Sequence, residues 1–126
     1  MTSIKKTLNI TFEEAVVRVQ NALKEQGFGI ITEIDVKETF KTKLNVDYPK
    51  YKILGACNPL LAKKALDADK TVGTVLPCNV AVFETDKGVD VYVQKPTEMM
   101  KALSYQNLGE VAREAESRLR KVVDSL

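Results

Sequence analysis

Histidine is absent from the 126 residues of this sequence. Histidine is the residue type that most often acts as a general base near neutral pH, and it is also a common metal ligand. Its absence excludes Ser-His-Asp and Cys-His catalysis within the chain, together with His-ligated zinc and haem. Any chemistry must therefore depend on Cys, Lys, Tyr, Asp or Glu.

Long apolar runs are missing as well. The longest cover only a few residues, as at residues 53–57, far fewer than the roughly 20 that a membrane-spanning helix needs. The first ten residues alternate polar and apolar side chains, unlike a secretory signal. We therefore expect no membrane association and a cytoplasmic location.

A strong charge imbalance is also lacking, because 19 basic residues face 17 acidic ones. Three short lysine pairs, at residues 5–6, 50–52 and 63–64, could form a nucleic-acid patch on which Tyr48 and Tyr51 stack bases. Acidic residues separate these pairs, so a solvated surface is the favoured interpretation and no nucleic-acid partner is expected. With 44% hydrophobic and 29% charged residues, the composition is that of one globular domain spanning residues 1–126.

Hydrophobic periodicity and turn residues predict ten elements. Strands are expected over residues 3–10, from 28, and over 50–57, 72–84 and 89–94, the last two joined by a hairpin at 85–88. Helices are expected over 12–26, from the cap Asp35 to about Asn45, and over 59–69 and 107–125, with a short helical turn opening at 95–97. The order β-α-β-α-β-α-β-β-α-α favours an α+β fold, with helices on one face of a mainly antiparallel sheet.

Two of these elements carry more specific expectations. In the second strand, simple alternation places Ile30 and Ile34 on one face and Glu33 on the other. The last helix, capped by Ser104 or Asn107, carries an apolar stripe of Leu108, Ala112, Ala115, Leu119, Val122 and Leu126. We favour a helix that covers the sheet with this stripe. The alternative is an interaction or scaffold protein that acts through this C-terminal helix.

The strongest candidate for a functional centre is the pair of Cys-Asn steps in the sequence. Cys57 ends a strand, Asn58 is placed to cap the next helix, and Pro59 suits the first helical position. A thiol just outside a helix N-terminus can have its pKa lowered. Cys57 is therefore a candidate thiolate, although a buried structural cysteine is the favoured explanation of the pattern. Gly55 indicates close approach of another backbone or a ligand.

The second step, Cys78-Asn79, follows Pro77. Proline cannot donate to a sheet ladder, so an edge strand or a bulge is expected there. Cys78 and Asn79 point to opposite faces of a regular strand, and only one of them can then face a pocket.

The spacing of the two cysteines argues against several chemistries. Twenty residues separate Cys57 from Cys78, unlike the redox motif Cys-x-x-Cys, and a structural disulfide is disfavoured in the cytosol. Two thiolates without histidine fall short of a tetrahedral zinc site unless carboxylates complete it or a dimer supplies four sulfurs. We predict no metal and no cofactor.

The two pentapeptides Gly55-Ala56-Cys57-Asn58-Pro59 and Leu76-Pro77-Cys78-Asn79-Val80 resemble the hallmark of the prokaryotic family called domain of unknown function 302. The resemblance extends over nearly the whole chain, including Gly27-Phe28-Gly29 and Lys95-Pro96. It implies an α+β fold with helices on a mainly antiparallel sheet, and a homodimer. It implies no activity.

Three functions remain open from the sequence. The first is a non-catalytic module, possessing a cleft for a small ligand near Gly55, Cys57, Asn58, Pro77, Cys78 and Asn79. The second is a thiol-redox or sulfur-carrier protein that uses Cys57 with Cys78 as its second thiol. The third is the scaffold role of the C-terminal helix. Because acid-base pairs are missing, we expect binding rather than catalysis.

Overall fold

Five antiparallel strands form one sheet in the computed structural model, which describes residues 3–126. The strands are β1 (Ser3–Leu8), β2 (Gly29–Asp35), β3 (Tyr51–Cys57), β4 (Cys78–Thr85) and β5 (Gly88–Gln94). Their order across the sheet is β1-β5-β4-β3-β2, which places β4 at the centre. The expected hairpin is confirmed, with Thr85 paired to Gly88.

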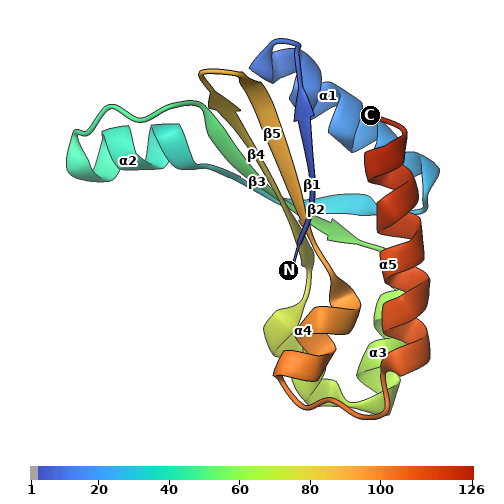
Figure 1. The fold of residues 1–126 in the computed structure, drawn as a ribbon. Helices are drawn as coiled ribbons and strands as arrows, with labels where there is room; N and C mark the ends of the chain where they lie inside the picture. Colours follow the sequence, from blue (N-terminus) through green and yellow to red (C-terminus); the bar gives the residue numbers. More distant parts are fainter. Residues whose placement is uncertain (1–2) are drawn as a thin grey trace.

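The helices are α1 (Phe12–Glu25), α2 (Val36–Leu44), α3 (Pro59–Ala68), α4 (Pro96–Ala102) and α5 (Gly109–Asp124), with a 3-10 helix η1 (Lys70–Val75). Helices α1 and α5 cover one face of the sheet, as Figure 1 shows. Valines and leucines at alternate strand positions fill the space between, and the most deeply buried are Leu54, Val80, Val82, Val91 and Val93. The α+β class and the predicted order of elements are confirmed.

The apolar stripe of α5 belongs to this core. Leu119 is 0% exposed and Val122 is 1% exposed, and both lie in the cluster that joins the sheet to α1. The alternative of a scaffold acting through this helix therefore lacks its surface, because the stripe is already buried within its own chain. The favoured interpretation, a helix that covers the sheet, is correct.

Three local expectations were wrong. Residues 72–76 were expected to be strand but lie in and after η1, because Asp69 accepts from the Thr71 amide at 2.9 Å and starts a helical turn. Neither Ser104 nor Asn107 caps α5, whose N-cap position is held by the buried Leu108. Pro77 introduces neither an edge nor a bulge.

Pro77 lies just before the first residue of the central strand β4, and the register between β3 and β4 is unbroken. Its missing amide hydrogen costs nothing at that position, because the ladder starts one residue later. The Leu76–Pro77 peptide bond is cis.

The expected alternation along β2 is also wrong, because the register with β3 shifts between Ile30 and Thr32. Ile30 pairs with the buried Ala56, whereas Ile34 pairs with Ile53 on the opposite face of the sheet. The extra residue, Ile31, therefore turns Ile34 away from the core and leaves it 48% exposed.

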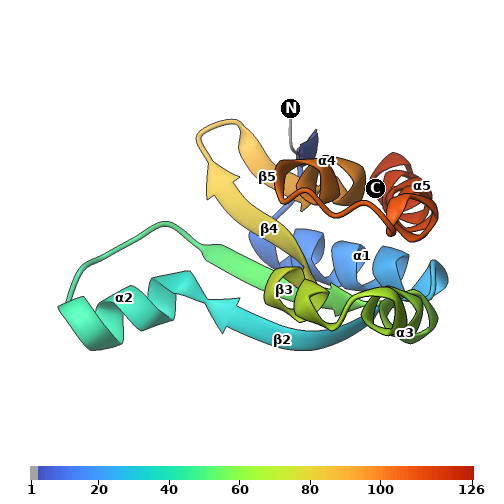
Figure 2. The same cartoon turned by 90° about the horizontal axis from the view of Figure 1, so that it is seen from below.

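Residues 34–50, which we call the arm, project away from the side of the sheet that α1 and α5 cover (Figures 1 and 2). The opposite side of the sheet, which we call the open face, presents Tyr51, Ile53, Ala81, Phe83 and Tyr92, and no helix in residues 3–126 packs over it as α1 and α5 do over the core side.

Candidate functional site

A cavity of about 60 Å³ lies where the ends of β3 and β4 meet α3, η1, α4 and α5. It separates the main core from a smaller apolar cluster around Ala65, Val72 and Leu108. No charged side chain lines it within the described residues. Its polar groups are the amides of Asn58 and Gln94 and the thiols of Cys57 and Cys78.

Small side chains explain why the packing leaves a cavity here. Five alanines line it, from β3, α3 and α5: Ala56, Ala62, Ala65, Ala112 and Ala115. Alanine has no atoms beyond Cβ, so two helices can approach each other and the strand while leaving a gap that a leucine would fill.

The first Cys-Asn step forms the strand-to-helix junction that the sequence predicts. Cys57 is the last residue of β3, and the Asn58 side-chain oxygen accepts from the Leu61 amide at 3.2 Å as the N-cap of α3. Pro59 holds the first helical position. Asn58 is only 9% exposed, and a Cβ on Gly27 would lie 3.0 Å from its side-chain nitrogen. The turn at Gly27 therefore closes over Asn58.

The second Cys-Asn step reaches the same cavity through strand pairing. Cys78 begins β4 and pairs with Ala56, the residue before Cys57, and both thiols line the cavity. Both cysteines are free. Burial raises the pKa of Cys78 to about 11, and the nearby Cys57 thiol contributes to the increase. Cys78 is thus a neutral thiol at physiological pH.

The two remaining predicted site residues lie outside the cavity. Gly55 pairs with Asn79 on the face of the sheet opposite Ala56. A Cβ on Gly55 would come within 2.0 Å of the Thr32 hydroxyl and 2.8 Å of the Pro77 ring. Close approach was correctly expected at Gly55, but the neighbours are these two side chains. Asn79 is exposed, as alternation with Cys78 predicts.

Sequence reasoning missed other parts of the wall. Three further residues line the cavity: Phe28 just before β2, Gln94 at the end of β5, and Met100 on α4. Gln94 also forms a hydrogen bond with Cys78 that partly opposes the increase in its pKa. Its signal in the sequence is a polar residue that ends an alternating apolar strand just before Pro96.

Two global features bear on what the site can hold. Across residues 3–126, His, Cys, Asp and Glu form no group of three or more that could hold a metal ion. Among the helices described here, none has both the length and the apolar character required to cross a membrane.

Comparison with known proteins assigns the chain to a family. Residues 4–126 match the family model described as "Domain of unknown function DUF302". The chain belongs to the DUF302 family. The DUF302 chain is also similar to an uncharacterized conserved DUF302 protein from Bacillus stearothermophilus, known from a crystal structure. The two are 28% identical with a TM-score of 0.91, covering 99% of this chain and 98% of that one. A search of curated proteins found no match.

Proposed function

We propose that this DUF302 protein is a cytoplasmic, non-catalytic module that binds a small uncharged ligand in the cavity beside Cys57, Asn58, Pro77 and Cys78, and that it works as a homodimer without a cofactor. The observation that carries the proposal is the convergence of Cys57 and Asn58 with Pro77 and Cys78 on one apolar cavity. The end of β3 and the start of β4 are separated by 20 residues in the sequence, yet together they line this cavity.

The chemistry of the wall selects the ligand. Moving an ion into an uncharged, apolar space costs several kcal/mol or more, so a charged ligand is disfavoured. Asn58 uses its side-chain oxygen as a helix cap, which leaves its NH₂ group and the amide of Gln94 to orient a single polar group. This combination of apolar walls with a few polar groups is typical of small-molecule sites.

The size of the cavity restricts the ligand further. At about 60 Å³ it is smaller than the ~150 Å³ apolar cavity that accepts benzene in an engineered protein. The ligand therefore has only a few non-hydrogen atoms unless a wall moves. Met100 is the wall residue best suited to move, because its unbranched side chain has three rotatable bonds.

The chemical groups in the cavity wall favour binding over catalysis. A neutral Cys78 is a poor nucleophile, and the cavity wall contains no carboxylate, amine or imidazole that could transfer a proton. The groups present are suited to holding a neutral molecule.

Native mass spectrometry of the purified protein tests the proposal. We expect a non-covalent adduct of low mass in the wild type and its loss in Ala112→Leu, which places three more carbons beside the cavity. Ala102→Leu is the matched control, because Ala102 is exposed on α4 and lies outside the wall. An adduct that survives Ala112→Leu would place the ligand elsewhere.

Xenon provides a second probe, because it enters dry apolar cavities. Under xenon pressure, we expect methyl NMR shifts at Leu61, Val72 and Val111 in the wild type and in Ala102→Leu, and none in Ala112→Leu. Unchanged methyl signals in the wild type would show that the cavity is closed to even a small apolar atom and would count against the proposal.

A second candidate is a thiol-redox or sulfur-carrier function of Cys57 with Cys78, which is supported by their position at one cavity. Alkylation at increasing pH, followed by intact mass, separates it from simple binding. This candidate requires one thiol to react at pH 6 faster than a model peptide. Two thiols that react no faster than the peptide would exclude it.

A further inference from the structure

We infer that the arm of one chain packs against the open face of a second copy, and that two such contacts related by a two-fold axis form a dimer. The inference rests on the homodimer in the proposed function and assigns its surface. It is independent of the cavity, whose wall includes no residue of the arm.

The arm is built as a helix that still needs a partner. Helix α2 has nine residues and buries none of them, although Asp35 caps its start and Asn45 ends it in the left-handed region. A helix this short is marginal in water unless an amphipathic face is packed. The arm exposes four large apolar side chains: Ile34 48%, Leu44 64%, Val46 45% and Tyr48 38%.

The arm is nevertheless ordered internally. Phe40 and Tyr48 meet edge to face with their ring centroids 4.9 Å apart, and Lys37 donates to the Tyr48 carbonyl at 2.7 Å. These contacts fold the segment after α2 back onto the helix. The arm therefore presents a formed surface.

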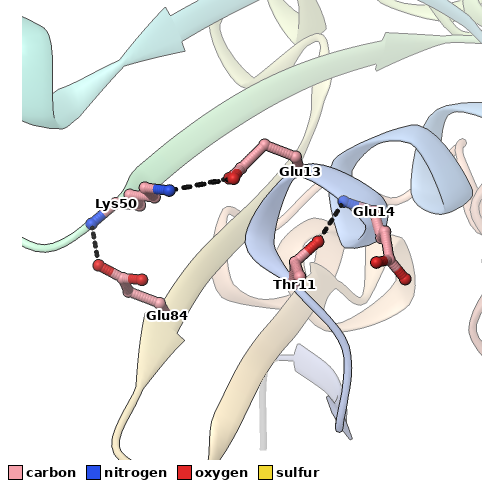
Figure 3. A network of polar contacts seen from close by, with 5 residues as sticks. All are labelled: Thr11, Glu13, Glu14, Lys50 and Glu84. Atoms are coloured by element: carbon pink, nitrogen blue, oxygen red, sulfur yellow. Dashed lines mark hydrogen bonds and ion pairs between the residues drawn. The ribbon is translucent and has the colours of Figure 1, made fainter.

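The root of the arm is fixed to the body of the protein, as Figure 3 shows. The Lys50 ammonium lies 3.0 Å from a carboxylate oxygen of Glu13 on α1, and the Lys50 amide donates to the Glu84 carboxylate on β4 at 3.0 Å. These bonds tie the last residue of the arm to α1 and β4, so the arm leaves the sheet in a defined direction.

The open face supplies the complementary surface. Tyr51, Phe83 and Tyr92 stack across three neighbouring strands with centroid separations of 4.9 and 5.6 Å. Ile53 and Ala81 continue this apolar surface toward the cavity end. All five side chains are only half-buried. Aromatic rings with one free side are typical of protein interfaces.

The area of these surfaces fits a reciprocal contact. A large side chain carries on the order of 150 Å² of accessible surface, so the four exposed residues of the arm present on the order of 300 Å². A stable dimer buries about 800 Å² per partner, which the arm alone does not reach. A two-fold contact buries the open face of each chain as well as its arm, and therefore buries more area than the arm alone.

A second copy is the occupant because both halves of the interface lie on one chain. In a two-fold interface, residue i contacts residue j of the partner while j contacts i. Each arm then covers the open face of the other chain, and neither surface stays unpaired. Addition of a strand at the free edge of β2 is a weaker solution, because the register shift at Ile31 disrupts that edge.

Sedimentation over a range of protein concentrations tests the inference. We expect a wild-type dimer, and Leu44→Glu should weaken it by roughly 30-fold or more. Leu60→Glu is the matched control, because Leu60 on α3 is 62% exposed but lies outside both surfaces, and it should leave dimerisation unchanged. A wild type that stays monomeric up to about 1 mM, or a dimer that survives Leu44→Glu, would overturn the inference.

Ala81→Glu tests the open face from its centre without removing an aromatic ring, and it should also give monomers. Leu44→Lys and Ala81→Glu chains mixed in equal amounts should then recover a heterodimer, since one native contact and one Lys–Glu contact form. No recovery in the mixture would overturn the exchange of arms. Circular dichroism confirms that each variant is folded.

The cavity experiments separate this inference from the binding proposal. Monomeric Leu44→Glu protein that retains the adduct and the xenon shifts supports the interface and keeps the binding function. A wild-type protein that is dimeric but shows neither the adduct nor the xenon shifts counts against the cavity alone.

Discussion

The two ends of β3 lead into helices of nearly equal length with opposite surroundings. Helix α2 precedes β3 within the arm and buries no residue, whereas α3 follows β3 and buries Leu61 and Ala65. Both begin at a side-chain cap, Asp35 for α2 and Asn58 for α3. Local signals thus decide where a helix starts. The surface against which it packs is decided by distant segments, so α3 packs beside the proposed ligand cavity whereas α2 is left for the proposed interface.

A leucine-to-alanine substitution should lower the free energy of unfolding by different amounts beside the cavity and on the arm. Leu108→Ala removes a side chain that is 2% exposed beside the cavity and should lower the free energy of unfolding by about 2–5 kcal/mol. Leu44→Ala, on the arm, should cost less than about 0.5 kcal/mol in the monomer. Urea unfolding at concentrations where the protein is monomeric measures both. Equal costs would show that the arm is packed within its own chain.

Because burial raises the pKa of Cys78, the free energy of unfolding should depend on pH. The folded state holds Cys78 protonated up to a pKa of about 11, whereas the unfolded thiol ionises near 9.0. The unfolded state therefore releases its proton first, and stability falls as pH rises from 9 to 11, by about 2–3 kcal/mol.

The matched variant Cys78→Ala lacks this contribution while keeping every lysine and tyrosine that also titrates in this range. The difference between the two unfolding curves isolates the thiol. Parallel curves for wild type and Cys78→Ala would contradict the burial of Cys78.

Gly55 lies within β3, where it contributes to the packing of the sheet but lies outside the cavity, so its substitution tests the two roles separately. Gly55→Ala forces a Cβ against Thr32 and the Pro77 ring and should cost about 1–3 kcal/mol, with cavity binding retained. Gly73→Ala in η1 is the control, because the nearest atom to its new Cβ is 3.8 Å away. Thermal unfolding compares the two variants. A neutral Gly55→Ala variant that no longer binds xenon would instead give Gly55 a role in the cavity.

At the root of the arm, Lys50→Met should have the smallest effect. Its ion pair with Glu13 is exposed, with 44% and 67% of the two side chains accessible, and such pairs contribute less than about 1 kcal/mol. The loss should disappear in 1 M salt, where screening removes the wild-type interaction as well. A larger, salt-independent loss would show that Lys50 supports the arm through packing.

The parts of the fold that sequence predicts well depend on short-range contacts. The caps Thr11, Asp35 and Asn58 each accept from an amide three residues later, at 3.1, 3.0 and 3.2 Å. Such contacts require only neighbours along the chain, so composition and spacing are sufficient to identify them. The exposure of Asn79 follows in the same way from alternation.

The parts that sequence could not predict depend on long-range placement. The meeting of Cys57 with Cys78 depends on the pairing of Ala56 with Cys78 across two strands, and no local pattern specifies that register. The burial of Leu108 at the start of α5 likewise depends on its contacts with Ala65 and Val72. These contacts override the polar residues that otherwise favour an earlier cap.

The register shift in β2 means that this strand has one residue more than the paired part of β3. The strand carries one residue, Ile31, that its pairing with β3 does not require. Deletion of Ile31 would straighten the strand and keep the pairings from Thr32 to Asp35 unchanged. The chain can therefore become one residue shorter here without turning the arm.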